Sequence, residues 1–157
     1  MRPLTRKLVI FFATGAGSGY APFAPGTAGS IVGLIVGYFL LAPLWSRAPI
    51  AFVVGFASAF VAACGVAGAA ERLFGEHDSS KIVIDEIFGM AAAMYLNPLG
   101  LISLGASFAL FRLFDILKPF PASLIDRRLG GGAGVMLDDL AAGIYANVVL
   151  QAARRLL

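Results

Sequence analysis

The stretch from Ala48 to Ala70, APIAFVVGFASAFVAACGVAGAA, contains no charged residue. About 20 mostly apolar residues are enough for one helix to cross a bilayer, so this stretch predicts a full membrane span. Residues 30–45 can form another membrane helix of about the minimum length, ended by Arg47. Residues 135–151 predict the last apolar helix, after a run of three glycines, 130–132, that we expect to break the chain.

A third apolar run, at residues 87–111, has Asn97-Pro98 at its centre. Proline removes a backbone donor and disfavours helix at the residue before it. We therefore expect two shorter helices meeting at that turn in place of one straight span. The sequence as a whole predicts an all-α integral membrane bundle with about four membrane-embedded helices, in a single domain over residues 1–157.

The composition supports a lipid environment. Hydrophobic residues make up 59% of the chain and charged residues 13%, whereas soluble domains average about 45–50% and 25%. A soluble domain of this size could not bury so much apolar surface. The formal charge is only +3, with no dense basic patch, which excludes a nucleic-acid partner and favours contact with an anionic lipid surface.

Basic residues indicate the orientation, because they are enriched in cytoplasmic loops. The N-terminal tail carries Arg2, Arg6 and Lys7, while the first turn between helices carries only Arg47. The tail and the loop at 75–81 are therefore expected on the cytoplasmic side. A basic, amphipathic segment from 112 to 129 should lie there as well, which requires both halves of the broken helix to return to that side.

Three acidic clusters border the apolar runs. A carboxylate near bilayer depth costs about 2.5–3.5 kcal/mol unless it is paired, hydrated or bound to a metal. Several such groups suggest a shared counter-charge, and Mg²⁺ is the leading candidate because it binds a few carboxylates together with phosphate oxygens. The candidate metal ligands are Asp85, Glu86, Asp115, Asp138 and Asp139.

Each cluster also has a structural interpretation. Asp85-Glu86 could cap a helix N-terminus and interact with its dipole. Arg112, Asp115 and Lys118 are spaced i, i+3, i+6, so they share one helical stripe and could form simple ion pairs. In the functional interpretation, Arg112 or Lys118 clamps a phosphate while Asp115 holds the metal.

The segment Pro25-Gly26-Thr27-Ala28-Gly29-Ser30 opens a membrane helix. Free backbone N–H groups at a helix start can hold an anion, which makes Thr27 a candidate phosphate-binding residue. Alternatively, Thr27 or Ser30 is simply the N-cap.

The residues present exclude several phosphatase mechanisms. Cys64 lies in an apolar helix, His77 is the only histidine and sits in a polar loop, and no Asp-x-Asp motif is present. These features exclude a cysteine nucleophile, a two-histidine site and a haloacid-dehalogenase site. Metal-assisted attack by water and a carboxylate nucleophile both remain open.

Four ordered motifs resemble the phosphatidylglycerophosphatase A family. They are the N-terminal segment from Ala13 to Ser30, IDEIFGM at 84–90, FRLFDILKPFP at 111–121 and MLDDLAAG at 136–143. The resemblance implies a Mg²⁺-dependent enzyme of the bacterial inner membrane that converts phosphatidylglycerophosphate into phosphatidylglycerol. It also implies an all-helical fold.

The roles within these motifs are our inference. We assign Asp85, Asp138 and Asp139 to metal, and Glu86 or Asp115 to metal or water activation. Lys118 and Arg112 are assigned to phosphate, with Lys118 also counted as catalytic. The active site is expected at the cytoplasmic face, where the substrate phosphate lies.

Two other functions use the same acids. A small cation-coupled transporter would bind a travelling ion with them, although the acids lie at helix ends and no internal repeat is visible. A membrane phosphotransferase would be expected to hold its carboxylates in one long motif. The sequence leaves the oligomeric state open.

Overall fold

The computed structural model describes residues 1–120, 124 and 129–156, and within these ranges it contains helices and no strands. Three of the helices are long and apolar enough to cross a membrane: Pro25–Arg47, Pro49–Phe74 and Gly131–Leu156. The all-helical membrane fold is therefore confirmed. In chain order the helices are α1 (Pro3–Ala13), α2 (Pro25–Val36), α3 (Ala42–Arg47), α4 (Pro49–Phe74), α5 (Ile84–Met94), α6 (Leu101–Leu117) and α8 (Gly131–Leu156).

Helix α4 forms where the uncharged stretch predicted it, and it extends one turn further, to Phe74. Gly75 follows with φ 70° and ends the helix in the left-handed conformation that glycine adopts without strain. The short helix α3 and a π-helical segment, Gly37–Leu41, continue α2 to the turn before α4. These three elements form the first span.

Helix α2 begins five residues earlier than residues 30–45 indicated. Its N-cap is Ala24, which makes no side-chain capping bond, and Pro25 occupies the first turn. The Ser30 hydroxyl lies within the helix and donates to the Gly26 carbonyl at 2.8 Å. The prediction that Thr27 or Ser30 is the N-cap was therefore wrong, because proline suits a first helical turn and starts the helix ahead of both.

The break in the third apolar run is confirmed. Helix α5 ends at Met94 and α6 begins at Leu101, with Asn97-Pro98 between them. Helix α6 continues through Arg112 to Leu117, so the first residues of the basic segment 112–129 belong to the second half of the broken run. Residues 121–123 and 125–128 of that segment lie outside the described residues.

Two polar side chains of α8 satisfy the carbonyl groups that this break leaves open. Asn147 Nδ2 donates to the carbonyls of Tyr95 at 2.6 Å and Ala93 at 3.2 Å. Gln151 Nε2 donates to Asn147 Oδ1 at 2.8 Å and approaches the Tyr95 carbonyl at 3.4 Å. A helix end shielded from water needs such partners, because a buried carbonyl group without one is costly.

Replacing Asn147 by Leu should therefore destabilise the protein. Hydrogen bonds of this kind within membrane proteins contribute about 1 kcal/mol. For a chain of this length, that loss corresponds to a fall of about 2–4 °C in the midpoint of thermal unfolding. Circular dichroism in detergent measures the shift. Val148→Leu is the matched control because Val148 is 60% exposed, and equal midpoints for the two variants would contradict the capping role.

Glycines allow α8 to pack closely on its neighbours. A Cβ atom at Gly132 would collide with the Cys64 carbonyl oxygen of α4, and one at Gly143 would collide with the Gly89 carbonyl oxygen of α5. Close backbone approach through small residues is typical of membrane helix pairs. The prediction that the glycine run breaks the chain was only half right: α8 begins at Gly131, and Gly132 is a helical contact residue.

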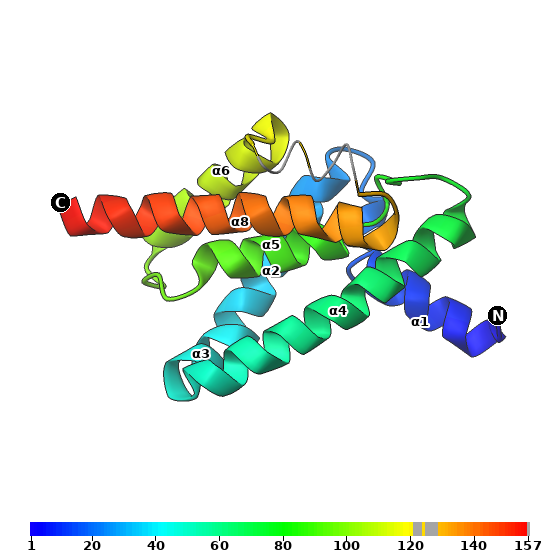
Figure 1. The fold of residues 1–157 in the computed structure, drawn as a ribbon, viewed down its shortest axis with the longest axis horizontal. Helices are drawn as coiled ribbons and strands as arrows, with labels where there is room; N and C mark the ends of the chain where they lie inside the picture. The colour runs from blue at the N-terminus through cyan, green and yellow to red at the C-terminus, as the bar shows by residue number, and fades with distance from the viewer. Residues whose placement is uncertain (121–123, 125–128, 157) are drawn as a thin grey trace.

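Helix α5 lies against α2, α6 and α8, and α8 runs alongside it in Figure 1. The start of α5 is joined to the end of α1 by a hydrogen bond from Val83 N–H to the Ala13 carbonyl, at 2.8 Å. One end of the bundle thus brings together the starts of α2, α5 and α8 and the end of α6. The chain ends at the opposite end of α8 from this meeting point (Figure 1).

Candidate active site

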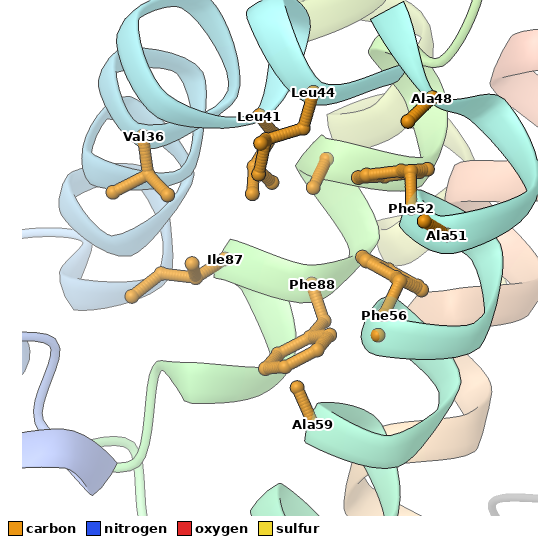
Figure 2. Close-up of a pocket in the computed structure, with 12 residues that line it drawn as sticks. Val36, Leu41, Leu44, Ala48, Ala51, Phe52, Phe56, Ala59, Ile87 and Phe88 are labelled. Carbon is orange, nitrogen blue, oxygen red and sulfur yellow. The ribbon is translucent and has the colours of Figure 1, made fainter.

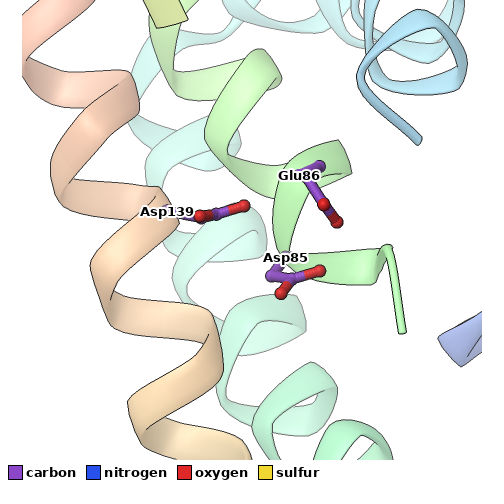
Figure 3. Close-up of side chains that lie close together, drawn as sticks. All are labelled: Asp85, Glu86 and Asp139. Carbon is purple, nitrogen blue, oxygen red and sulfur yellow. The ribbon is translucent and has the colours of Figure 1, made fainter. Parts of the chain in front are cut away.

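Three carboxylates from two helices converge at this end of the bundle. Asp85 and Glu86 occupy the first turn of α5, and Asp139 comes from α8. One oxygen from each lies within 4.8 Å of the others, and Figure 3 shows Asp139 extending from α8 toward the start of α5, where Asp85 and Glu86 lie. Asp85 and Asp139 are only 7% and 4% exposed. Asp85 and Glu86 do not cap α5, since its N-cap is Val83 and no side chain caps it, but both lie in the first turn, where the helix dipole favours acids.

The hydrogen bonding of these carboxylates favours a cation. Asp85 Oδ1, Glu86 Oε2 and Asp139 Oδ2 are buried and have no hydrogen-bond partner among the described residues. A buried acceptor without a partner costs about 1–3 kcal/mol, and more when it is charged. A hard divalent cation binds through such oxygens, so one ion could satisfy all three. The residues present therefore fit a metal site.

Burial and like charge act on this group in the same direction. Burial raises the pKa of Asp85 well above its usual range, and the nearby Glu86 and Asp139 carboxyls raise it further. Burial also raises the pKa of Glu86, and the charge of Asp115 adds to the rise. Several carboxylates that repel one another in a buried place are stable together only with a counter-charge.

Two ion pairs flank the three carboxylates. Arg112 Nη1 donates to Asp115 Oδ2 at 2.5 Å, within the last turns of α6. Lys118 Nζ donates to Asp138 Oδ2 at 2.6 Å and so links the end of α6 to α8. The expected pairing on the α6 stripe is thus confirmed for Arg112 and Asp115. Adjacent residues point about 100° apart on a helix, and accordingly Asp139 faces α5 while Asp138 faces Lys118.

The start of α2 supplies the anion-binding side of the site. A Cβ atom at Gly26 would collide with Glu86 Oε1 and lie 3.2 Å from Arg112 Nη1. The N–H groups of Gly26 and Thr27 belong to the first helical turn and have no partner within the helix. We call the start of α2, with Arg112 and Glu86 against Gly26, the α2 corner; a helix start of this kind can bind an anion. Cation ligands and anion donors therefore lie side by side.

Two residues other than glycine adopt left-handed backbone conformations at this site. Ala24 (φ 46°) precedes α2, and Lys118 (φ 41°) ends α6. Such conformations cost about 1–3 kcal/mol and tend to occur at functional sites. At Lys118 the conformation brings the ammonium group to Asp138; at Ala24 it turns the chain into the start of α2.

His77 and Cys64 lie outside this group. His77 Nδ1 is 2.6 Å from Glu71 Oε1, with 67% of its side chain exposed. It holds the loop after α4 together with the Asp78 N–H, which donates to the same carboxylate. Cys64 is partly buried on α4.

The contact of Gly26 with Glu86 was not predicted from the sequence. Gly26 belongs to segment 25–30, which was considered for anion binding. A helix start indicates that backbone N–H groups are free, but it does not indicate which side chains pack against them. Asn147 and Gln151 were missed too, and the signal for them was two amides within the apolar helix predicted at 135–151.

Comparisons with known proteins identify the family of the chain. A family model described as phosphatidylglycerophosphatase A matches residues 11–154. A Haemophilus influenzae protein named phosphatidylglycerophosphatase A is 41% identical over 139 residues, which are 88% of this chain and 83% of the relative. An Escherichia coli protein of the same name is 32% identical over 139 residues, covering 88% of this chain and 78% of the relative.

A third relative carries a different name. A Bacteroides thetaiotaomicron protein named "Putative phosphatidylinositol-3-phosphatase" is 38% identical over 156 residues, 94% of each chain. All three names describe removal of phosphate from a lipid. No solved structure matches the chain.

Proposed function

Because the chain belongs to the phosphatidylglycerophosphatase A family, we propose that it hydrolyses the terminal phosphate monoester of phosphatidylglycerophosphate, releasing phosphatidylglycerol and inorganic phosphate. One observation supports this most strongly. Three carboxylates, each with a buried and unpartnered oxygen among the described residues, lie beside Arg112 and the first turn of α2. The carboxylates suit a divalent cation, and the start of α2 with Arg112 suits a phosphate ester, so the two ligands can bind side by side.

Asp85, Glu86 and Asp139 would hold the cation, with Asp115 and Asp138 beside them. Mg²⁺ is our choice because it accepts a few carboxylates and leaves positions for phosphate oxygens. When bound, it supplies positive charge next to the phosphoryl oxygens and makes a nearby water more acidic. Glu86 also contacts the start of α2, which supports a role for it beside both the cation and the phosphate.

The other residues bind the phosphate. The Arg112 guanidinium and the N–H groups of Gly26 and Thr27 can donate to its oxygens in the corner described above. Asp115 holds Arg112 in place through their ion pair. Lys118, held by Asp138, brings a second positive charge to the end of α6. These donors are strongest where charge develops on the phosphoryl oxygens in the transition state.

Hydrolysis forms a bond from water oxygen to phosphorus and breaks the bond from phosphorus to the glycerol oxygen. Glu86 or Asp115 would accept the proton that the attacking water releases. The departing oxygen needs a proton in return, and the Lys118 ammonium is the candidate donor. The transporter alternative is not favoured, because these groups lie at helix ends with an anion-binding corner beside them.

The site would face the cytoplasm in the bacterial inner membrane. The basic N-terminal tail leads through α1 to the start of α5, where two of the carboxylates lie (Figure 1), and this supports a cytoplasmic site under the positive-inside rule. The substrate phosphate would then reach the site at headgroup depth without leaving the bilayer.

Phosphate release from the purified protein in detergent micelles tests the proposal. We expect release from phosphatidylglycerophosphate that stops when EDTA removes divalent cations and returns when Mg²⁺ is added. Phosphatidylinositol-3-phosphate is the second substrate, because one relative bears that name. Preference for the inositol lipid would change the substrate assignment, and no release from either lipid by folded protein would overturn the enzyme assignment.

A further inference from the structure

The two sides of α5 differ in polarity. One side faces an apolar pocket of about 400 Å³ between the first span and α4, and the side chains drawn in Figure 2 carry only carbon atoms. On the other side, Gly89 lies so close to α8 that a Cβ atom would collide with the Asp139 carbonyl oxygen. A polar residue that helps to position the candidate site is therefore expected between α5, α6 and α8.

Lys118 is held in an unusual conformation at the end of α6. Its backbone is left-handed, with φ 41°, and its N–H donates to the Phe114 carbonyl at 2.8 Å. Its ammonium group donates to Asp138 Oδ2 at 2.6 Å. A residue other than glycine keeps such a conformation only where the surrounding structure holds the chain. The contacts on either side of Lys118 therefore decide where its ammonium group lies.

Tyr145 of α8 makes contacts on both sides of Lys118. Its hydroxyl group donates at 2.8 Å to the carbonyl of Phe120, which follows Lys118 by two residues. Its ring meets the ring of Phe114, one turn before Lys118, edge-on with 5.8 Å between the ring centres. One side chain thus joins the last turn of α6 to the chain that follows it.

Tyr145 and Asp138 lie on the same side of α8. They are seven residues apart in the sequence, which is about two turns, so their side chains share one stripe of the helix. Helix α8 packs against α6, and this stripe contacts Phe114, Lys118 and Phe120. Asp138 holds the ammonium group of Lys118, while Tyr145 holds the backbone that carries it.

We propose that Tyr145 is a positioning residue for Lys118 and, through it, for the phosphate site. This inference rests on the proposed function, in which Lys118 supplies positive charge and a proton to the reaction. The hydroxyl proton of Tyr145 is donated to the Phe120 carbonyl, so Tyr145 acts on Lys118 through the backbone. A displacement of about 1 Å in an active site can reduce the rate about 100-fold, so even a small movement of Lys118 is expected to be measurable.

A purely structural role for Tyr145 would give a different result. A hydrogen bond that only closes the chain after α6 would change activity by the same factor whatever residue stands at position 118. A positioning role predicts coupling between positions 145 and 118, because Tyr145 then affects the reaction only through the Lys118 ammonium group.

The first measurement is a double-mutant cycle on phosphate release from phosphatidylglycerophosphate. Tyr145→Phe keeps the ring that contacts Phe114 and removes only the hydroxyl group, so the variant should fold. We expect it to lower kcat about tenfold in the wild type and to have little effect in a Lys118→Met background. An unchanged kcat, or equal losses in both backgrounds, would overturn the positioning role.

Tyr38→Phe is the matched control, because it removes the same hydroxyl group elsewhere in the chain. Tyr38 lies in the first span, is 38% exposed, and its ring contacts the neighbouring Phe39. The control should keep the wild-type kcat.

The second measurement does not depend on hydrolysis. The chain has three lysines, Lys7, Lys81 and Lys118, and brief acetylation followed by mass spectrometry gives the reactivity of each. An ammonium group held against a carboxylate reacts slowly, because acetylation requires the free amine. We expect Tyr145→Phe to raise the acetylation rate of Lys118 about fivefold, the factor that one net hydrogen bond represents. Lys7 and Lys81 should keep their wild-type rates.

The two measurements separate this inference from the proposed function. Faster acetylation of Lys118 alone in Tyr145→Phe, without hydrolysis by any variant, would support the link between the two residues and reject the enzyme. Hydrolysis with unchanged acetylation of Lys118 in folded Tyr145→Phe would support the enzyme and overturn the positioning role. Faster acetylation of all three lysines would also overturn it, because the whole fold would then have loosened.

Discussion

Asp139→Asn is expected to lower phosphate release by at least about 100-fold. Loss of a residue that only supports a metal ligand already costs about 10–100-fold, and Asp139 supplies one of the three oxygens that converge on the proposed cation. Asparagine keeps the size of the side chain but removes its charge. Measuring initial rates at saturating Mg²⁺ with the natural lipid tests the effect.

The same variant should also respond differently to Mg²⁺ in a thermal unfolding experiment. A ligand that binds the folded state raises its stability according to its affinity, so Mg²⁺ should raise the unfolding midpoint of the wild type. In Asp139→Asn that rise should shrink or vanish. Without the cation, the variant should be at least as stable as the wild type, because one of several buried like charges is gone.

Asp78→Asn is the control for both experiments. Asp78 lies in the loop after α4, away from the three carboxylates, with φ 49°, a conformation that asparagine tolerates. It should retain both activity and the response to Mg²⁺. Wild-type activity in Asp139→Asn, or an undiminished response to Mg²⁺, would contradict the assignment of Asp139.

Gly26→Ala should lower activity about 100-fold while leaving the fold intact. The added Cβ atom would collide with Glu86 Oε1 at the start of α2. That oxygen is the end of a flexible side chain, so the collision is relieved by moving the carboxylate, with little cost to folding. A displacement of about 1 Å in an active site can reduce the rate about 100-fold.

A double-mutant cycle identifies the cause of this loss. In a Glu86→Asp background the carboxylate is one methylene shorter, so Gly26→Ala should cost clearly less than in the wild type. Gly105→Ala is the control, because a Cβ atom at Gly105 meets nothing within 4 Å. Equal losses in both backgrounds would show that the alanine acts on something other than Glu86.

The membrane fold followed directly from the order of residues. An uncharged stretch long enough to cross the bilayer has essentially one stable form, a helix, because hydrocarbon provides no partners for the backbone. The break at Asn97-Pro98 was predictable for a similar reason, since proline removes a donor wherever it stands. Helix starts were less certain, and α2 began at Pro25, ahead of the polar residues expected to cap it.

The candidate site was predictable in composition but not in arrangement. Charged residues in apolar surroundings stand out because their burial must be compensated, so Asp85, Glu86 and Asp139 could be named in advance. Which acid of the pair 138–139 faces α5 depends on the rotation of α8, and that rotation is set by packing. The close contacts of Gly132 and Gly143 with α4 and α5 fix it.

The lipid environment, the approximate course of the membrane helices and the chemical type of the site could be predicted from the residues alone, because each depends on local length, charge and residue type. Packing between helices set the relations that make the site: Asp139 joins Asp85 and Glu86 while Asp138 pairs with Lys118, and Gly26 touches Glu86. These relations join helices far apart in the chain. They arise from how close two backbones can approach, which no single segment encodes.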